Sequence, residues 1–307
     1  MLTNINLIET INDQVTRTRI PSATRTPTFY PSEASIMMPH GRIDGGCHRK
    51  TFYRISGLQR TNPAGQLLCW RGLLGKEAEN LVVKALTQSG MYESRGTKFY
   101  DPELNLSGEL DIVAKGVTND GTPFYYGIEV KSIYGNWAVN NHIKGRRRWR
   151  GQPPIVPHPK LAHLMQTMLY VWYFREQLAG FKLLYIARDT GEQREYNIKL
   201  RQFLTEDGTV KHCAEVDGTP DRTIVLEDIH DRYRALRAKL VEATTSGVPP
   251  DREFQLRYDN ETMATLREQE VGSDYRVGDA KHEKWERGED IGDWQCGYCD
   301  FKQLCYA

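Results

Sequence analysis

The sequence predicts an α/β fold in which a central mixed sheet is flanked by helices. Segments with strand-like alternation and composition occupy the middle of the chain, and segments with apolar residues every three or four positions stand on either side of them. A chain of 307 residues with 39% hydrophobic content can bury a sizeable core. No internal repeat interrupts this pattern, so we expect one sheet rather than a repeated unit.

The individual elements follow from periodicity. Apolar residues between 74 and 86 predict an amphipathic helix, and GELDIVAKG and TPFYYGIEVKS, joined by the turn residues TNDG, predict two neighbouring strands. Residues 161–178 predict a second helix, followed by a buried strand in FKLLYIARD. Two further helices are expected at 227–246 and near 261–270. The helices and strands therefore alternate as an α/β core requires.

Residues 1–40 differ from the remainder because their Thr, Ser and Pro content is high and they lack sustained periodicity. We expect an irregular N-terminal arm over 1–40 and one domain over 41–307.

Composition restricts the classes of partner. The 41 Lys and Arg residues nearly balance the 40 Asp and Glu residues, so any polyanion site must be a local patch. No apolar run reaches the length of a membrane helix, and the polar start lacks the pattern of a signal peptide. We therefore expect a cytoplasmic protein with no membrane partner. The sequence does not indicate an oligomeric state.

Three residues on the two middle strands carry the chemistry. Asp111 lies on the first strand, and Glu129 and Lys131 lie on the second, two positions apart and so on one face. Two carboxylates held close together repel unless a cation joins them, and hard oxygen ligands suit Mg²⁺ or Mn²⁺. Because Glu129 lies in an apolar run where an unpaired charge would be costly, we expect a metal-dependent active site rather than a solvated sheet rim.

This arrangement resembles the PD-(D/E)XK nuclease superfamily, and Gln166 with Tyr170 resembles the QxxxY motif of its RecB-type branch. The resemblance implies a restriction-endonuclease-like core in which Asp111, Glu129 and the Val130 carbonyl hold the metal. It also implies that Lys131 positions or activates the attacking water. Gln166 and Tyr170, four residues apart on one helix face, would orient the lysine or the nucleic-acid strand.

The family's first motif commonly carries a histidine after a glycine, whereas GKEAENLVV offers Glu79 four residues after Gly75. Glutamate can bind the same metals through oxygen, so Glu79 is the expected additional ligand. Glu77 is the alternative at this position. Glu109 is a further candidate because it lies two residues before Asp111 on the same strand.

The chain's last residues contain three cysteines, Cys296, Cys299 and Cys305, and clustered cysteines in a reducing compartment favour a metal site. With Cys47 upstream, this pattern is similar to iron–sulfur nucleases of the Cas-four and AddB type. The resemblance implies a [4Fe–4S] cluster that joins the N-terminal and C-terminal segments of the domain. Four thiolates also suit zinc. Cys69 and Cys213 lack matching spacing, and we expect them to be free, buried thiols.

A basic stretch, NNHIKGRRRWRGQPP, separates the second catalytic strand from the QxxxY helix. It supplies cations for phosphate contacts and a ring for base stacking; the candidates are Lys144, Arg146, Arg147, Arg148, Trp149 and Arg150. A solvated loop is the alternative. Arg17, Arg19 and Arg25 are further candidates for DNA contact, unless they belong to a disordered tail.

Together these features predict a Mg²⁺- or Mn²⁺-dependent deoxyribonuclease, an exonuclease acting on single-stranded DNA by attack of metal-activated water. Two alternatives remain from the sequence: a non-catalytic iron–sulfur DNA-binding module and a restriction-type endonuclease. Cleavage polarity, exonuclease against endonuclease action, selectivity for DNA over RNA and the biological pathway do not follow from the residues.

Overall fold

The computed structural model describes residues 7–18, 28–37, 43–62, 65–145, 154, 156–217, 223–269 and 276–306. The chain divides into two compact units. Unit 1 comprises Met1–Ala34 with Gly65–Ala238, and unit 2 comprises Ser35–Ala64 with Lys239–Ala307. This division differs from the expected arm over 1–40 and single domain over 41–307, because residues from both ends of the chain pack together in unit 2.

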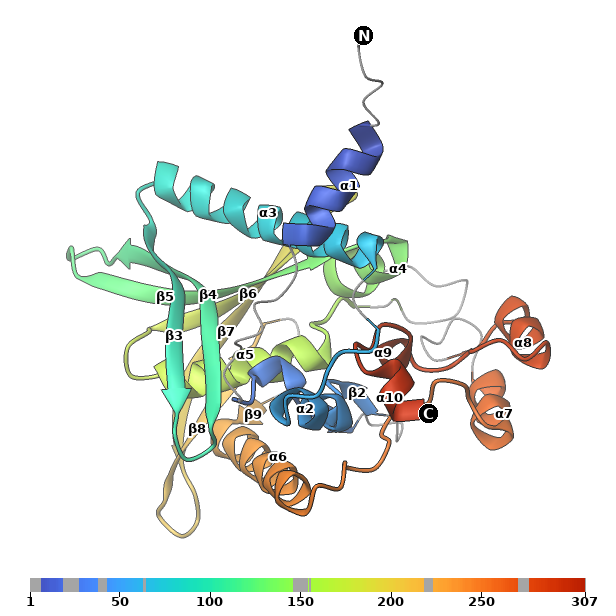
Figure 1. Ribbon diagram of the computed structural model, residues 1–307. Helices are drawn as coiled ribbons and strands as arrows, with labels where there is room; N and C mark the ends of the chain where they lie inside the picture. The colour runs from blue at the N-terminus through green and yellow to red at the C-terminus, as the bar shows by residue number, and fades with distance from the viewer. Residues whose placement is uncertain are drawn as a thin grey trace. The chain divides into compact units, whose positions relative to one another are not determined.

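Unit 1 is built on a seven-stranded sheet with the order β3-β4-β5-β6-β7-β8-β9 (Figure 1). Strands β5 and β6 are parallel, and every other neighbouring pair is antiparallel. The expected central mixed sheet is therefore present. Its strands are β3 (Tyr92–Asp101), β4 (Leu106–Val117), β5 (Pro123–Ile133), β6 (Gly180–Ala187), β7 (Gln193–Leu204), β8 (Val210–Val216) and β9 (Thr223–Val225).

Helices cover both faces of this sheet (Figure 1). Val82, Val83 and Leu86 of α3 (Gln66–Gln88) pack against Ile112 and Ile128 on one face. The side chains of α5 (Leu161–Phe174) contact Glu129 and Lys131, which alternate with Ile128 and therefore lie on the other face. The parallel pairing of β5 with β6 needs a crossover connection, and α5 lies within it.

Several short elements complete unit 1. The connection after β5 contains α4 (Asn136–Val139) and the π-helix η2 (Asn140–Lys144), and the 3-10 helix η1 spans Pro31–Glu33. Helix α6 (Leu226–Ser246) begins in unit 1 and continues into unit 2.

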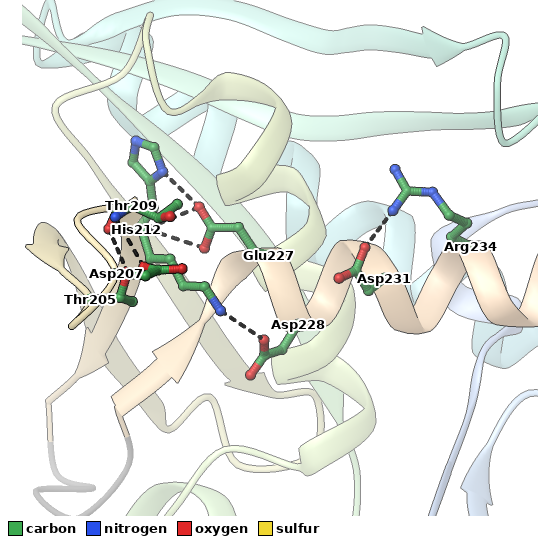
Figure 2. A network of polar contacts seen from close by, with 9 residues as sticks. Thr205, Asp207, Thr209, His212, Glu227, Asp228, Asp231 and Arg234 are labelled. Carbon is green, nitrogen blue, oxygen red and sulfur yellow. Dashed lines mark hydrogen bonds and ion pairs between the residues drawn. The ribbon is translucent and has the colours of Figure 1, made fainter.

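The junction of β8 with α6 is held by polar contacts (Figure 2). Glu227, in the first turn of α6, accepts hydrogen bonds from the backbone nitrogen of His212 at 3.0 Å and from its Nδ1 at 2.9 Å. The β7–β8 turn is closed by Thr205 and Asp207, whose side chains are hydrogen bonded to one another. The Glu227 contacts therefore tie the first turn of α6 to β8.

Helix α1 (Leu7–Thr18) corrects the expectation of an irregular arm over 1–40. Ile8, Ile11 and Val15 recur at three- and four-residue spacing, a helical period that precedes the Thr- and Pro-rich stretch. Val15 is buried, and Trp70 Nε1 of α3 donates a hydrogen bond to Asn12 Oδ1 at 3.0 Å. Helix α1 is therefore anchored on α3.

Unit 2 contains a two-stranded sheet and short helices. Its elements are β1 (Ser35–Met37), β2 (Ile43–Gly45), α2 (His48–Ile55), α7 (Asn260–Glu268), α8 (Asp279–Glu286), α9 (Trp294–Gly297) and α10 (Lys302–Tyr306). One small core consists of Tyr258, Met263, Leu266 and Val277. A ring contact joins the two segments of unit 2: the rings of Tyr53 in α2 and Phe301 near the C-terminus lie 5.5 Å apart.

Candidate active site and cysteine site

Asp111 lies where the pairing of β4 with β5 ends. The ladder runs from Val117↔Pro123 to Ile112↔Ile128, and Asp111 is the next residue of β4. Its Oδ2 accepts a hydrogen bond from the backbone nitrogen of Val130 at 2.8 Å, in place of a backbone acceptor. The carboxylate is thereby held against β5, beside Glu129.

The same geometry sets the direction of the Val130 carbonyl. Along a strand, the N–H and C=O of one residue point toward the same neighbouring strand, and successive residues alternate. The carbonyls of Tyr125 and Ile133 face β6, since they accept from the backbone nitrogens of Ala179 and Arg188 at 2.8 and 3.0 Å. Val130 therefore faces β4, on the side where Asp111 has left the ladder.

Glu129, Lys131 and Gln166 form one connected group on the α5 face. Lys131 Nζ donates to Glu129 Oε1 at 2.6 Å and to Gln166 Oε1 at 2.9 Å. Gln166 Nε2 donates to Glu129 Oε1 at 3.1 Å and to the Tyr170 hydroxyl at 3.0 Å. The five residues assigned to the active site by the sequence therefore converge from β4, β5 and α5.

Burial dominates the electrostatics of these carboxylates. Glu129 is only 2% exposed, and its Oε2 has no hydrogen-bond partner among the described residues. Burial and the neighbouring Glu129 carboxylate raise the pKa of Asp111 to about 8. Burial also raises the pKa of Glu129, and Lys131 opposes that shift. A bound cation would favour the ionised form of both carboxyl groups and would give the Glu129 Oε2 oxygen a partner.

Glu79 lies closer to this group than Glu77 does. The Glu79 carboxylate acts electrostatically on both Asp111 and Glu129, raising the pKa of each, while it pairs with Arg95 at 2.7 Å. The exposed Glu77 accepts from Asn80 at 2.9 Å on its own helix. Glu109 is also exposed, and its carboxylate lies over Gly96 of β3, where an added Cβ would be 2.8 Å from the Glu109 Oε1. Glu79 is thus the better placed of the three for an additional ligand.

His163 is a residue near the site that our sequence reasoning did not single out. Its Nδ1 lies 3.0 Å from the Tyr185 hydroxyl. Burial, with the nearby charge of Lys131, holds the pKa of His163 well below its ordinary value, so the imidazole is neutral. Its position three residues before Gln166, on the same helix face, was the available signal.

The four cysteines Cys47, Cys296, Cys299 and Cys305 line one pocket of unit 2, together with the cations Arg49, Lys50, Arg252 and Lys302. The thiols are close enough to influence one another electrostatically: Cys299 acts on both Cys47 and Cys296. Burial raises the pKa of Cys47 to about 12 and that of Cys296 to about 11. Thiols this reluctant to ionise alone need a bound cation to become thiolates.

Protein contacts, independent of any metal, bring Cys47 to the C-terminal cysteines. Glu253 accepts from the backbone nitrogen of His48 at 2.9 Å and pairs with His48 Nδ1 at 2.7 Å, which positions the residue next to Cys47. Asn62 Nδ2 donates to the Cys299 carbonyl at 2.9 Å. The sequence separation of Cys47 from the others is therefore bridged by these side chains.

Neither set of residues is arranged as a finished metal site. Across the part of the chain that the structure describes, no three Cys, His, Asp or Glu side chains converge closely enough to hold a metal ion. The donor types fit nonetheless: four thiols line one pocket, and the carboxylates present a partnerless buried oxygen. Cys69 and Cys213 are buried in unit 1, form no disulfide, and do not line the pocket.

Most of the basic stretch falls outside the described residues. Among the candidates for DNA contact, Arg146, Arg147, Arg148, Trp149 and Arg150 are not described, and neither are Arg19 and Arg25. Lys144 is described and forms an ion pair with Glu192. Arg17 lies in the last turn of α1. Within the described residues, no helix is long and apolar enough to cross a membrane.

Comparison with known proteins gives no family. No family model matches the chain, and no curated protein matches it. One solved structure, the crystal structure of SSO0001, aligns with 99% of this chain and 98% of its own, at 12% sequence identity and a TM-score of 0.42. A likeness at that score carries no argument, so the function must be argued from the site.

Proposed function

We propose that this chain is a metal-dependent deoxyribonuclease with a PD-(D/E)XK core, acting as an exonuclease on single-stranded DNA. The observation that carries the proposal is the connected group of Asp111, Glu129, Lys131 and Gln166 at the point where β4 leaves β5. A bound Mg²⁺ or Mn²⁺ would supply a water of lowered pKa and offset charge on the phosphate.

The metal would be held by Asp111, Glu129 and the Val130 carbonyl, with Glu79 as an additional oxygen ligand. The unpartnered Glu129 Oε2 and the raised pKa of Asp111 support this assignment, since both groups gain from a nearby cation.

Lys131 supplies the positive charge beside the scissile phosphate and orients the attacking water. Gln166 holds the ammonium through its Oε1. Burial raises the pKa of Tyr170, so its hydroxyl stays protonated and fixes the Gln166 amide that orients Lys131. A lysine held from two sides is preorganised for the transition state.

For unit 2 we propose a [4Fe–4S] cluster held by Cys47, Cys296, Cys299 and Cys305. Four thiols on one pocket with four nearby cations support an anionic cluster. Its role would be structural, fastening the segment at Cys47 to the end of the chain.

The test is a cleavage assay on anaerobically purified protein with Mn²⁺ or Mg²⁺. The substrates are linear single-stranded and double-stranded DNA carrying a label at either end, and circular single-stranded DNA. We expect stepwise shortening of the linear single strand from one end and no cutting of the circle. Lys131→Ala should lower the rate about 1,000-fold, as expected for a residue that acts on the transition state. Near-native turnover by Lys131→Ala, or no cleavage by the wild type with either metal, would refute the proposal. Cutting of the circle would replace the exonuclease with an endonuclease.

A further inference from the structure

His163 is a titratable group beside Lys131 that the function proposed above does not use. It lies on α5, three residues before Gln166, which accepts a hydrogen bond from Lys131 at 2.9 Å. Its Nδ1 lies 3.0 Å from the hydroxyl of Tyr185 in β6. Tyr185 is the register partner of Lys131 in the parallel pairing of β5 with β6, so their side chains leave the same face of the sheet one strand apart. Among the charges that act on His163, that of Lys131 has the largest effect. The helix and the sheet therefore both place the imidazole next to the lysine.

The Tyr185 ring, to which His163 is bonded, is fully buried and held by two other rings. The His142 ring stacks on it, with 5.6 Å between centroids and 19° between planes, and the Tyr196 ring meets it edge-on at 5.9 Å. These two neighbours are themselves joined, because the Tyr196 hydroxyl donates to the His142 carbonyl at 2.8 Å. The Tyr185 hydroxyl therefore has a fixed position.

The Tyr185 hydroxyl decides which nitrogen of His163 carries the proton. The backbone nitrogen of Lys160 donates to the hydroxyl oxygen at 3.0 Å. The hydroxyl proton then needs an acceptor of its own, because buried hydroxyls are nearly always paired, and among the described residues His163 Nδ1 is the acceptor within reach. Burial and the charge of Lys131 keep the pKa of His163 low and the ring neutral. In a neutral imidazole whose Nδ1 accepts, the proton lies on Nε2.

The Nε2–H group is left without a protein partner. The two nitrogens of an imidazole ring point away from each other, so Nε2–H is directed away from Tyr185. Within the part of the chain that the structure describes, no residue is hydrogen bonded to this nitrogen, and His163 is partly exposed. A fixed donor next to Lys131 is suited to an oxygen of the phosphate that the lysine would face.

We propose that His163 donates its Nε2–H to a non-bridging oxygen of the phosphate that Lys131 contacts. This inference rests on the proposed nuclease function and adds a substrate-contacting residue to that site. A neutral donor suits this position because an imidazolium would be repelled by the Lys131 ammonium, whereas an N–H dipole is not. Since Tyr185 fixes the ring, the donor is in place before charge develops on the phosphate.

The first test reads the tautomer by ¹⁵N NMR of protein labelled at its eight histidines, in EDTA so that no strand is cut. The resonance that disappears in His163→Gln identifies His163. Wild type should show the Nε2–H form from pH 6 to 8.5, and Tyr185→Phe, which lacks the donor to Nδ1, should show a mixture of tautomers. Adding oligothymidine should shift the Nε2–H proton downfield. An Nδ1–H form in wild type, or no shift on binding, would overturn the proposal.

The second test uses two substitutions that each keep one end of the imidazole. The glutamine amide nitrogen reaches about as far as Nε2, whereas asparagine reaches only as far as Nδ1. With Mn²⁺, His163→Asn should lower kcat about 100-fold and His163→Gln at most about tenfold, as expected for loss and retention of one donor to a developing oxyanion. The control is His282→Asn, which changes a histidine of α8 in unit 2 and should cleave as wild type does. Circular dichroism of each variant confirms that it is folded.

The pH profile separates a neutral donor from a general acid or base. The ratio of the wild-type rate to that of His163→Gln should be the same at pH 6 and 8.5, because neither side chain changes its charge in that range. A ratio that changes with pH, or equal rates for the glutamine and asparagine variants, would overturn the phosphate contact while leaving a cleaving wild type as a nuclease. If the wild type cleaves with neither metal but its Nε2–H resonance shifts on binding oligothymidine, the contact stands and the nuclease falls.

Discussion

Replacing Asp111 with asparagine should stabilise the metal-free protein, although it should abolish activity. Burial and the Glu129 carboxylate raise the pKa of Asp111 to about 8, from an ordinary value of 3.8. A folded state with a raised carboxyl pKa prefers the protonated form. It is therefore most stable below the unfolded pKa, and this stability is lost as the pH rises toward 8.

The size of the effect follows from that shift. Each pKa unit corresponds to about 1.4 kcal/mol, and pH 7 lies about three units above the ordinary Asp value, so the penalty at pH 7 is about 4 kcal/mol. Asparagine carries no charge, and its Oδ1 can still accept from the Val130 nitrogen as Asp111 does. Asp111→Asn should therefore gain up to about 4 kcal/mol at pH 7 and close to nothing at pH 4.

The assay is urea unfolding in EDTA at pH 4.5, 7 and 8.5, followed by the same series with Mn²⁺. Wild type should lose stability from pH 4.5 to 8.5 more steeply than Asp111→Asn, and Mn²⁺ should stabilise wild type alone. Asp101→Asn is the matched control. Hydrogen bonds, chiefly from Tyr173, hold the pKa of Asp101 below its ordinary value, so the same substitution there should destabilise at pH 7. A destabilised Asp111→Asn, or equal pH slopes for the two proteins, would refute the reasoning.

Three other predictions concern the cysteines, the basic stretch and the sheet. Protein purified anaerobically should be brown and contain about four iron atoms per chain. Cys47→Ala or Cys296→Ala should lose the colour and expose both segments of unit 2 to protease. Cys69→Ala and Cys213→Ala should keep the colour. A colourless protein with one zinc per chain would assign the pocket to zinc. Neutralising Arg146, Arg147, Arg148 and Arg150 together should make the slope of log DNA affinity against log salt concentration shallower, by the equivalent of about three to four phosphate contacts. An unchanged slope would show that this stretch is a solvated loop. Gly108→Ala would place a Cβ 2.3 Å from the Phe99 ring and 2.9 Å from that of Tyr170, so it should cost about 1 to 3 kcal/mol in a melting experiment; an unchanged melting temperature would show that both rings can move aside.

Periodicity was sufficient for the elements that carry the active site. The strands at Asp111 and Glu129 and the helices α5, α6 and α7 lie where their apolar spacing predicts them, within a few residues, whereas α3 begins at Gln66, eight residues before the expected segment. Their side-chain faces follow from the same periods: Lys131 meets Glu129 because they are two apart on a strand, and Gln166 meets Tyr170 because they are four apart on a helix. Contacts within one element are local, and local spacing determines them.

The remaining strands were missed because their patterns are weak. Strand β3 reads YESRGTKFYD and is charged, and β7 is largely exposed beyond Ile198, so neither shows a clear apolar face. Each is held by backbone hydrogen bonds to its neighbours, which do not depend on side-chain pattern. Helix α1 was missed because its short apolar period is followed by a Thr- and Pro-rich stretch.

The sequence by itself determined which residue types meet on one strand or helix, and it singled out Asp111, Glu129, Lys131 and the three clustered cysteines, to which the family resemblance added Cys47. Only the tertiary structure decided that Glu79 rather than Glu77 acts on the carboxylates, and that Asp111 leaves the ladder to accept from Val130. It also decided that Cys47 shares a pocket with Cys296, through Glu253 and Asn62. The physical reason is the sequence separation of the residues in contact. Helical and strand periods fix neighbours a few residues apart, whereas contacts across hundreds of residues depend on how the whole chain packs.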